Sequence, residues 1–352
     1  MSDEIKTLLL DTLERLLREQ CSPERVEAAE QGGFDAELWQ QIAELELHRA
    51  ALPESEGGVA ADLPVITDML TVAARYALPA PVAEAMLLAP WLVTLAGTEL
   101  AEGLTTVAPA GSGVRLQREG DSWLVEGEFS RVPAGRFADA LLSVVVDGDN
   151  EWLIELSADQ WQVNEGSNLA GEARDGLIVN ALTLTVDQCS AVPAGTADKL
   201  WQLGALARSA QLVGALRRAQ ELSHNYVSER SQFGRPLAKF QAIQQQLALL
   251  AADLEAAAVM SGLAAMGFSG ANPGDIAAAK IAAGQAAGMG ARIAHQVHGA
   301  MGFTQEYPLH HATRRLWSWR DEYGSETYWA GKVGDGLIER GAEALWPWLT
   351  AG

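Results

Sequence analysis

Apolar residues recur at helical spacing through the first hundred positions. Leucines at positions 8, 9, 10, 13, 16 and 17 mark the apolar face of a helix over residues 5–18. The same spacing returns over residues 34–47, 62–76 and 81–96. Gly32-Gly33 and the segment Leu-Pro-Glu-Ser-Glu-Gly-Gly at residues 52–58 separate these helices, because Gly and Pro interrupt helical structure. The pattern predicts an N-terminal helical domain over residues 1–100.

The pattern changes near residue 101, where apolar residues alternate or form short β-rich runs. Such runs occupy residues 123–125, 141–146, 152–156 and 182–186, with Gly, Asp and Asn between them. Several short strands at this spacing indicate a small β-barrel or sandwich. We expect this middle β-domain to cover residues 101–195.

Long helical stretches dominate the remaining residues, 196–352. Residues 203–230 contain no proline and predict a helix about 42 Å long. A second helix is expected over residues 240–266, and a third runs from an N-cap near Asp275 to about His298. Gly284, Gly288 and Gly290 lower helix propensity in the third helix, a cost that close helix packing could offset. The sequence therefore predicts a multi-domain α+β protein that ends in a long four-helix bundle.

Charge and composition narrow the possible functions. The 352 residues include 25 Lys and Arg against 46 Asp and Glu, a net charge of −21, which repels nucleic acids and acidic membrane surfaces. The two cysteines, Cys21 and Cys189, form no metal or redox motif, as is usual in a reducing compartment. The N-terminus lacks the pattern of a signal peptide, and no apolar stretch is judged long enough to span a membrane. We expect a cytoplasmic protein with no nucleic-acid partner and no membrane span.

Most short catalytic motifs are missing from the sequence. Glu221-Leu-Ser-His224 is a single Glu-x-x-His element, whereas a di-iron bundle needs two such elements and two further glutamates, so we expect no metal site. Neither a Walker loop nor a Gly-x-Ser-x-Gly elbow is present. Near the C-terminus, three arginines lie close in sequence to three tryptophans: Arg314, Arg315 and Arg320, with Trp317, Trp319 and Trp329. These residues form either the basic edge of a helix with aromatic core contacts, or a site that binds an anion or stacks on a flat ring.

Two turns carry a more specific signal. Arg230-Ser-Gln-Phe-Gly234 with Phe240-Gln241 closes the first long helix, and Gln296-Val-His-Gly-Ala-Met-Gly302 closes the third. Together with residues 52–58 and the order of helices, strands and helices, these turns resemble the acyl-CoA dehydrogenase family. The resemblance implies FAD, with the turns contacting the adenosine diphosphate half of a neighbouring subunit's flavin. The implied cofactor-binding residues are Arg230, Gln232, Phe233, Gln241, Gln296, Gly299, Ala300, Ser325 and Thr327.

The resemblance fails where the family carries out its chemistry. The family desaturates an acyl-CoA thioester between its α- and β-carbons, with a carboxylate as the base. The two positions known for that base fall on Tyr323 and Gly204, and neither residue is a carboxylate. Tyrosine is mostly protonated at neutral pH because its ordinary pKa is about 10. Glu322 is adjacent, but a one-residue step turns its side chain in another direction, so it is a weak candidate for the base.

The middle domain departs from the family in the same way. A substrate loop of the family is reduced to Ala108-Pro-Ala-Gly-Ser-Gly113. Its flavin-facing Trp-Ile-Thr segment corresponds to Arg131-Val132-Pro133, and proline has no N–H to offer a flavin carbonyl. The losses therefore lie on the side of the flavin ring and the substrate, whereas the turns that serve a neighbour's FAD remain.

Our leading hypothesis is a non-catalytic subunit of a heteromeric acyl-CoA dehydrogenase, in fatty acid or steroid side-chain catabolism. By resemblance it would share FAD across a subunit interface, within a dimer or tetramer formed with a homologous catalytic subunit or with itself. Acyl-CoA would be the substrate and electron-transferring flavoprotein the electron acceptor. The alternatives are a self-sufficient dehydrogenase with Glu322 as a relocated base, and a non-enzymatic acyl-CoA-binding scaffold.

Overall fold

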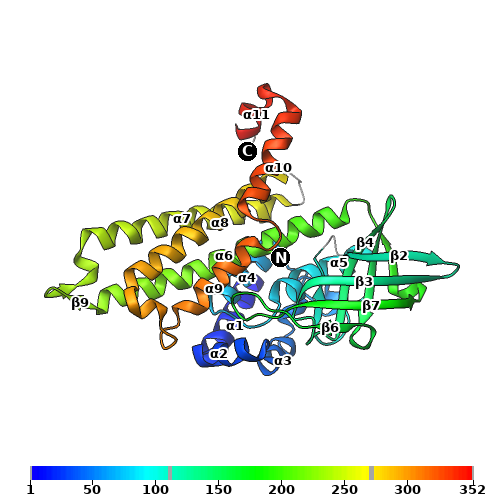
Figure 1. The fold of residues 1–352 in the computed structure, drawn as a ribbon, viewed down its shortest axis with the longest axis horizontal. Helices are drawn as coiled ribbons and strands as arrows, with labels where there is room; N and C mark the ends of the chain where they lie inside the picture. Colours follow the sequence, from blue (N-terminus) through cyan, green and yellow to red (C-terminus); the bar gives the residue numbers. More distant parts are fainter. Residues whose placement is uncertain (1, 110–112, 269–272, 351–352) are drawn as a thin grey trace.

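The computed structural model describes residues 2–109, 113–268 and 273–350 of the chain. Helices come first, two β-sheets follow, and long helices complete the molecule. Figure 1 shows an elongated molecule with the sheets at one end and the β9 turn at the other, joined by α6. The predicted fold class, a multi-domain α+β protein with this order of elements, is confirmed.

The N-terminal helices form where apolar residues and capping side chains coincide. They are α1 (Asp3–Gln20), α2 (Pro23–Gly32), α3 (Ala36–Glu44), α4 (Leu63–Arg75) and α5 (Ala89–Ala96), the last preceded by a π-helical turn at Glu84–Leu88. The side chains of Ser22, Asp35 and Asp62 each accept a backbone N–H of the first turn that follows. The apolar pattern did not reveal α2, because that helix buries only Val26 and Ala29.

Two four-stranded sheets make up the middle of the chain. One has the order β1-β4-β5-β8 and the other β2-β3-β7-β6; only β1 and β4 pair in parallel among the described strands. Their inner faces share a core that includes Val125, Phe129, Leu141 and Leu177. The strands are β1 (Thr105–Val107), β2 (Gly113–Glu119), β3 (Ser122–Pro133), β4 (Ala140–Asp147), β5 (Asn150–Ser157), β6 (Gln162–Asn164), β7 (Arg174–Leu184) and β8 (Cys189–Val192).

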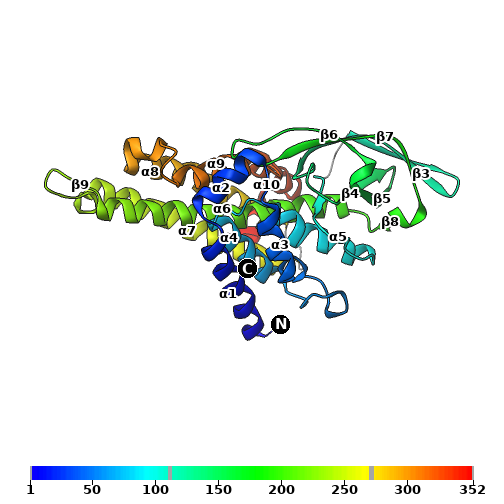
Figure 2. The same cartoon turned by 90° about the horizontal axis from the view of Figure 1, so that it is seen from below.

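Among the C-terminal helices, the first is longer than the sequence pattern indicated. The first, α6 (Thr196–Glu229), has 34 residues and extends about 51 Å. Figures 1 and 2 show it running from the sheets to the far tip, where a short hairpin links it to α7. The other elements are β9 (Ser231–Gln232), β10 (Arg235–Pro236), α7 (Gln241–Gly267), α8 (Pro273–His298), α9 (Leu309–Asp321), α10 (Glu326–Arg340) and α11 (Leu345–Thr350).

The glycines of α8 permit close packing of its neighbours. A Cβ at Gly284 would lie 2.1 Å from Oε1 of Glu326, and one at Gly290 would lie 2.4 Å from Cδ2 of Leu216. Both distances are far below van der Waals contact. Close packing of α8 against α10 and α6 is therefore present at these glycines, as expected from their low helix propensity.

Within the described residues, one helix, α7, is long and apolar enough by length and composition to cross a membrane. The sequence prediction that no stretch reaches this length was wrong for α7. In the fold, α7 buries Leu250, Leu254 and Ala257 in a core shared with α6 and α8. Only 28% of the tested window of α7 is buried, and its apolar residues Leu249, Val259 and Leu263 are exposed.

Candidate functional site

The loop between α9 and α10 carries Glu322 and Tyr323, and buried hydrogen bonds fix its path. The ammonium of Lys280 in α8 donates to the carbonyls of Arg320, at 2.6 Å, and Gly324, at 2.9 Å. The indole N–H of Trp329 donates to the Tyr323 carbonyl at 2.9 Å. Tyr323 itself has a φ of 54°, which is uncommon for a residue with a side chain. Three hydrogen bonds from two buried side chains thus hold the loop.

Tyr323 lies directly against Gly204, so the two positions expected for a catalytic base meet in space. A Cβ at Gly204 would lie 2.3 Å from Cδ1 and Cε1 of the tyrosine ring, and Trp201 packs edge-on at 5.4 Å between ring centres. Tyr323 is only 5% exposed. Its ring therefore fills the space in which a carboxylate from either position would act.

The Tyr323 hydroxyl is chemically passive in this setting. It is buried and has no hydrogen-bond partner among the described residues. Burial raises the pKa of Tyr323, and the negative charge of Glu84 raises it further. The phenol therefore remains protonated at neutral pH and does not act as a base.

Glu322 is held between two arginines. The Arg174 guanidinium binds both carboxylate oxygens, with Nε–Oε1 at 2.8 Å and Nη2–Oε2 at 3.2 Å, and Nε of Arg208 lies 2.6 Å from Oε2. The side chain is 9% exposed. Burial alone would raise the pKa of Glu322, but the charges of Arg174 and Arg208 outweigh it and lower the pKa to about 2. Glu322 is consequently a structural anion rather than a proton acceptor.

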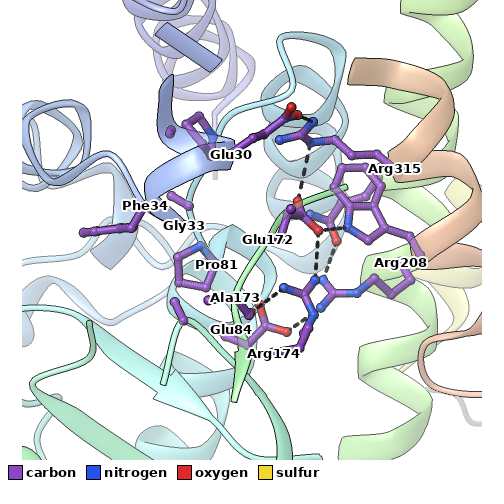
Figure 3. Close-up of a pocket in the computed structure, with 17 residues that line it drawn as sticks. Glu30, Gly33, Phe34, Pro81, Glu84, Glu172, Ala173, Arg174, Arg208 and Arg315 are labelled. Carbon is purple, nitrogen blue, oxygen red and sulfur yellow. Dashed lines mark hydrogen bonds and ion pairs between the residues drawn. The ribbon is translucent and has the colours of Figure 1, made fainter. Parts of the chain in front are cut away.

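These contacts belong to a larger buried ionic network, and Figure 3 draws the part of it that includes Glu84, Glu172, Arg174 and Arg208 beside a pocket. Arg208 also binds Glu84 at 2.7 Å, and Arg174 also binds Glu172 at 3.1 Å. The Trp319 indole N–H donates to Glu172 at 2.9 Å. The network continues through Arg315, which contacts Glu172 and Glu30. With Arg314, whose side chain is 32% exposed, also bound to Glu30, four carboxylates face four guanidiniums in this network.

A small cavity lies beside Arg131, Pro133 and Tyr323, where the resemblance would place a flavin ring. Its volume is about 180 Å³, below the roughly 300–1,000 Å³ of most small-molecule sites. Its walls include the charged groups of Arg174, Arg208 and Glu322. Pro133 offers no N–H to a ring carbonyl. These residues do not fit an isoalloxazine ring. Residues 110–112 of the shortened loop lie outside the described residues.

The two predicted turns share the tip of the bundle. Arg230, Gln232, Phe233 and Gln241 are exposed, Phe233 by 91%, as are Gln296, Gly299 and Ala300. Tyr226, just before the first turn, stacks on His298, just before the second, with ring centres 4.6 Å apart. The structure therefore brings both turns to the same end of the bundle, where they are exposed.

This tip is remote from Tyr323. Gly204 and Arg230 are 26 positions apart along α6, which corresponds to about 39 Å of helix. Ser325 and Thr327, also predicted to bind the cofactor, lie at the start of α10 instead. Ser325 caps that helix by accepting the Tyr328 N–H at 3.4 Å, and Thr327 is exposed. The predicted cofactor residues thus divide between two places in the molecule.

The other sequence candidates have structural roles. Arg314 and Arg315 bind Glu30, and Arg320 binds Glu326. These arginines are therefore not available as an anion site. Glu221, from the single Glu-x-x-His element, is paired with Arg75 at 2.7 Å, and His224 is exposed.

The buried charges Glu30, Glu84, Glu172, Arg174 and Arg208 were missed by sequence reasoning. Their partners are distant in the chain; Arg208 and Glu84, for example, are 124 positions apart. The available signal was the occurrence of charged residues inside otherwise apolar helical stretches, as at Glu84 and Arg208.

Comparison with known proteins gives matches at both the sequence and the fold level. The acyl-CoA dehydrogenase N-terminal domain model matches residues 3–101, and the C-terminal domain model matches residues 196–326. The acyl-CoA dehydrogenase IpdE2 of Mycolicibacterium smegmatis is 29% identical over 315 residues, covering 88% of this chain and 91% of that protein. The acyl-CoA dehydrogenase FadE27 of Mycobacterium tuberculosis is also 29% identical, over 82% of this chain and 85% of the relative.

Among solved structures, a chain of the ChsE4-ChsE5 complex from Mycobacterium tuberculosis superposes with a TM-score of 0.89 at 22% identity, over 97% of this chain and 99% of that one. The Tcur3481-Tcur3483 steroid ACAD gives a TM-score of 0.87 at 24% identity, over 97% of this chain and 99% of that one. At these identities the likeness concerns the fold.

Proposed function

Because this chain belongs to the acyl-CoA dehydrogenase family, we propose that it is the partner subunit of a heteromeric member of that family. In this role the exposed turns at the tip of its bundle contact the FAD that is bound by a catalytic subunit. The acyl-CoA thioester is then desaturated in that other subunit.

The state of Glu322 is the observation that carries this proposal. A general base must reach the substrate's proton and be able to accept it near the working pH. Glu322 is bound by Arg174 and Arg208, and its pKa is lowered to about 2. Tyr323 and Gly204 provide no carboxylate at the family's two base positions. This arrangement argues against the alternative of a self-sufficient enzyme with Glu322 as its base.

The residues for the two halves of FAD differ in this chain: the turns for the adenosine diphosphate half are retained, whereas the site for the flavin ring is not, and this supports a cofactor shared between subunits. The cavity beside Arg131 and Pro133 is small and lined by charged groups, so the chain does not accommodate a flavin ring of its own. FAD, when bound, supplies the acceptor for the hydride that leaves the acyl chain. This chain's part would be to bind the pyrophosphate through Arg230, since a guanidinium supplies charge and forked donors.

The distance between the exposed turns and the position of the missing base supports a role in binding the FAD of another subunit. The exposed turns lie about 39 Å along α6 from the position of the missing base. The relatives' names are consistent with this setting: one solved structure is a complex of two different chains, and another is called a steroid acyl-CoA dehydrogenase. We therefore include a steroid side chain among the plausible acyl groups, and electron-transferring flavoprotein as the family's electron acceptor.

The test is reconstitution with candidate catalytic subunits. The chain is purified alone and after co-expression with homologous dehydrogenase subunits, and flavin per chain and acyl-CoA turnover are measured. We expect flavin and turnover only in the mixed assembly. One full FAD per chain with turnover from the lone protein would overturn the proposal, and a stable assembly without flavin would favour a binding scaffold.

Arg230→Ala sharpens this experiment. In the mixed assembly it should weaken FAD retention by removing one charged donor, an effect of about 1.5–3 kcal/mol for a hydrogen bond to a charged group. Arg115→Ala is the matched control, because Arg115 is an exposed arginine on β2 at the other end of the molecule. Equal flavin retention in the two variants would count against the role of the turn.

A further inference from the structure

Two histidines at the start of α9, the first of them eight positions after Gly302 of the second turn, face two glutamates of α2. Glu27, Glu30, His310 and His311 can each offer one ligand atom, and these atoms all lie within 4.8 Å of one another. Nε2 of His310 is 3.2 Å from Oε2 of Glu27, and Nε2 of His311 is 3.8 Å from the same oxygen. Three potential ligand atoms therefore converge on one point between the helices.

Hydrogen bonds at the other ring nitrogens orient both imidazoles. Nδ1 of His310 lies 3.0 Å from the Tyr307 carbonyl, and Nδ1 of His311 lies 3.0 Å from Oε1 of Glu30. A carbonyl and an arginine-paired carboxylate only accept hydrogen bonds, so each Nδ1 carries the proton. In the neutral rings each Nε2 then presents a lone pair toward Glu27, and three acceptors face one another. Such a set is stabilised by a cation between them.

The spacing suits a tetrahedral transition-metal ion. With zinc–nitrogen and zinc–oxygen bonds of about 2.0–2.1 Å, ligand atoms at tetrahedral angles lie about 3.3–3.4 Å apart. The two distances to Glu27, 3.2 and 3.8 Å, bracket that value. Two imidazoles and a carboxylate are ligands that zinc accepts, with a fourth position left for water.

Glu30 serves as support rather than as a direct ligand. Its carboxylate is committed to Arg314 and Arg315 and accepts the Nδ1–H of His311. A carboxylate behind a metal-bound histidine fixes the ring orientation and increases the basicity of Nε2. Solvent reaches the site from the side of Glu27, whose side chain is 30% exposed, while that of His310 is 16% exposed.

We propose that Glu27, His310 and His311 bind a divalent transition-metal ion of the zinc type, which fastens α2 to α9. The ligands come from helices more than 280 positions apart in the sequence. The ion would therefore stabilise the contact between the N-terminal helices and the C-terminal bundle. These three ligands are not among the residues predicted to contact FAD, and this proposal does not rest on the role proposed for the chain.

Zinc titration of the chelator-treated full chain tests the proposal. Calorimetry should show one equivalent of Zn²⁺ per chain, and Zn²⁺ should raise the melting temperature. Glu27→Gln and His310→Gln should each weaken binding by at least about tenfold, since loss of a supporting contact alone costs 10–100-fold. Circular dichroism of the metal-free variants verifies that they fold. Co²⁺ in place of Zn²⁺ should give the visible bands of four-coordinate cobalt.

His224→Gln is the matched control, because His224 is an exposed histidine of α6 whose neighbour Glu221 is bound to Arg75. This variant should bind Zn²⁺ like the unmodified chain. The proposal fails if the chain shows no saturable Zn²⁺ binding, in which case a proton on His310 balances Glu27. It also fails if binding survives both Glu27→Gln and His310→Gln.

Discussion

Replacing Glu322 by glutamine separates a structural anion from a catalytic base. Glutamine has nearly the same shape but no charge, so it leaves Arg174 and Arg208 buried with one carboxylate fewer. Each arginine keeps a second partner, Glu172 and Glu84 respectively. The variant should therefore fold, but with a lower free energy of unfolding.

The size of the loss follows from the pKa of Glu322, which is lowered from 4.5 to about 2. At 1.36 kcal/mol for each pH unit, the charged form is favoured in the folded state by about 3 kcal/mol. Breaking a buried ion pair typically costs about 3–5 kcal/mol, and the remaining partners place Glu322→Gln near the lower end of that range.

Urea unfolding at pH 7, followed by circular dichroism, measures this loss. Asp321→Asn is the control, because Asp321 is the exposed neighbour of Glu322 and should change the free energy of unfolding by less than about 0.5 kcal/mol. In a reconstituted assembly, Glu322→Gln should leave turnover per folded complex unchanged. A Glu322→Gln chain that is as stable as the parent, with turnover abolished, would refute the structural role and restore Glu322 as a base.

Three further predictions concern the same region. First, the pKa values of Glu30 and Glu322 are each lowered from 4.5 to about 2, so the stability that these carboxylates provide is complete above pH 4.5 and declines as the pH falls toward 2. The urea midpoints of unfolding at pH 7, 4 and 3 should therefore decrease in that order. A midpoint that does not change with pH would contradict the buried network. Second, Gly204→Ala should destabilise the chain by about 1–3 kcal/mol, because the new methyl group would meet the Tyr323 ring. The control is Gly262→Ala, which has nothing within 4 Å of its Cβ and should be neutral or stabilising by up to about 1 kcal/mol. Equal effects of the two substitutions in thermal melts would argue against the contact. Third, Tyr323→Phe should leave both stability and reconstituted turnover unchanged, because the buried hydroxyl has no partner among the described residues to lose, and a fall in turnover would reveal a chemical role for it.

Much of the architecture could be predicted from local sequence. The helical spacing of leucines predicted α1, α3 and α4 to within a few residues. The proline-free stretch predicted α6 but placed its start seven residues late, at 203 rather than Thr196. β1, β2, β6 and β8 were not predicted; β1, β6 and β8 have only three or four residues, which leave too short a pattern to recognise.

The sequence by itself determined most of the helices and the β-rich middle of the chain, which turns resemble flavin-binding turns, and that the two base positions implied by the resemblance hold no carboxylate. Only the tertiary structure decided that Glu322 is neutralised by Arg174 and Arg208, which lie 148 and 114 positions away. It likewise decided that Tyr323 fills the space beside Gly204. Periodicity reveals which face of an element is buried, but the charge opposite that face depends on how distant elements pack, and the packing sets whether a carboxylate takes up a proton or holds an arginine.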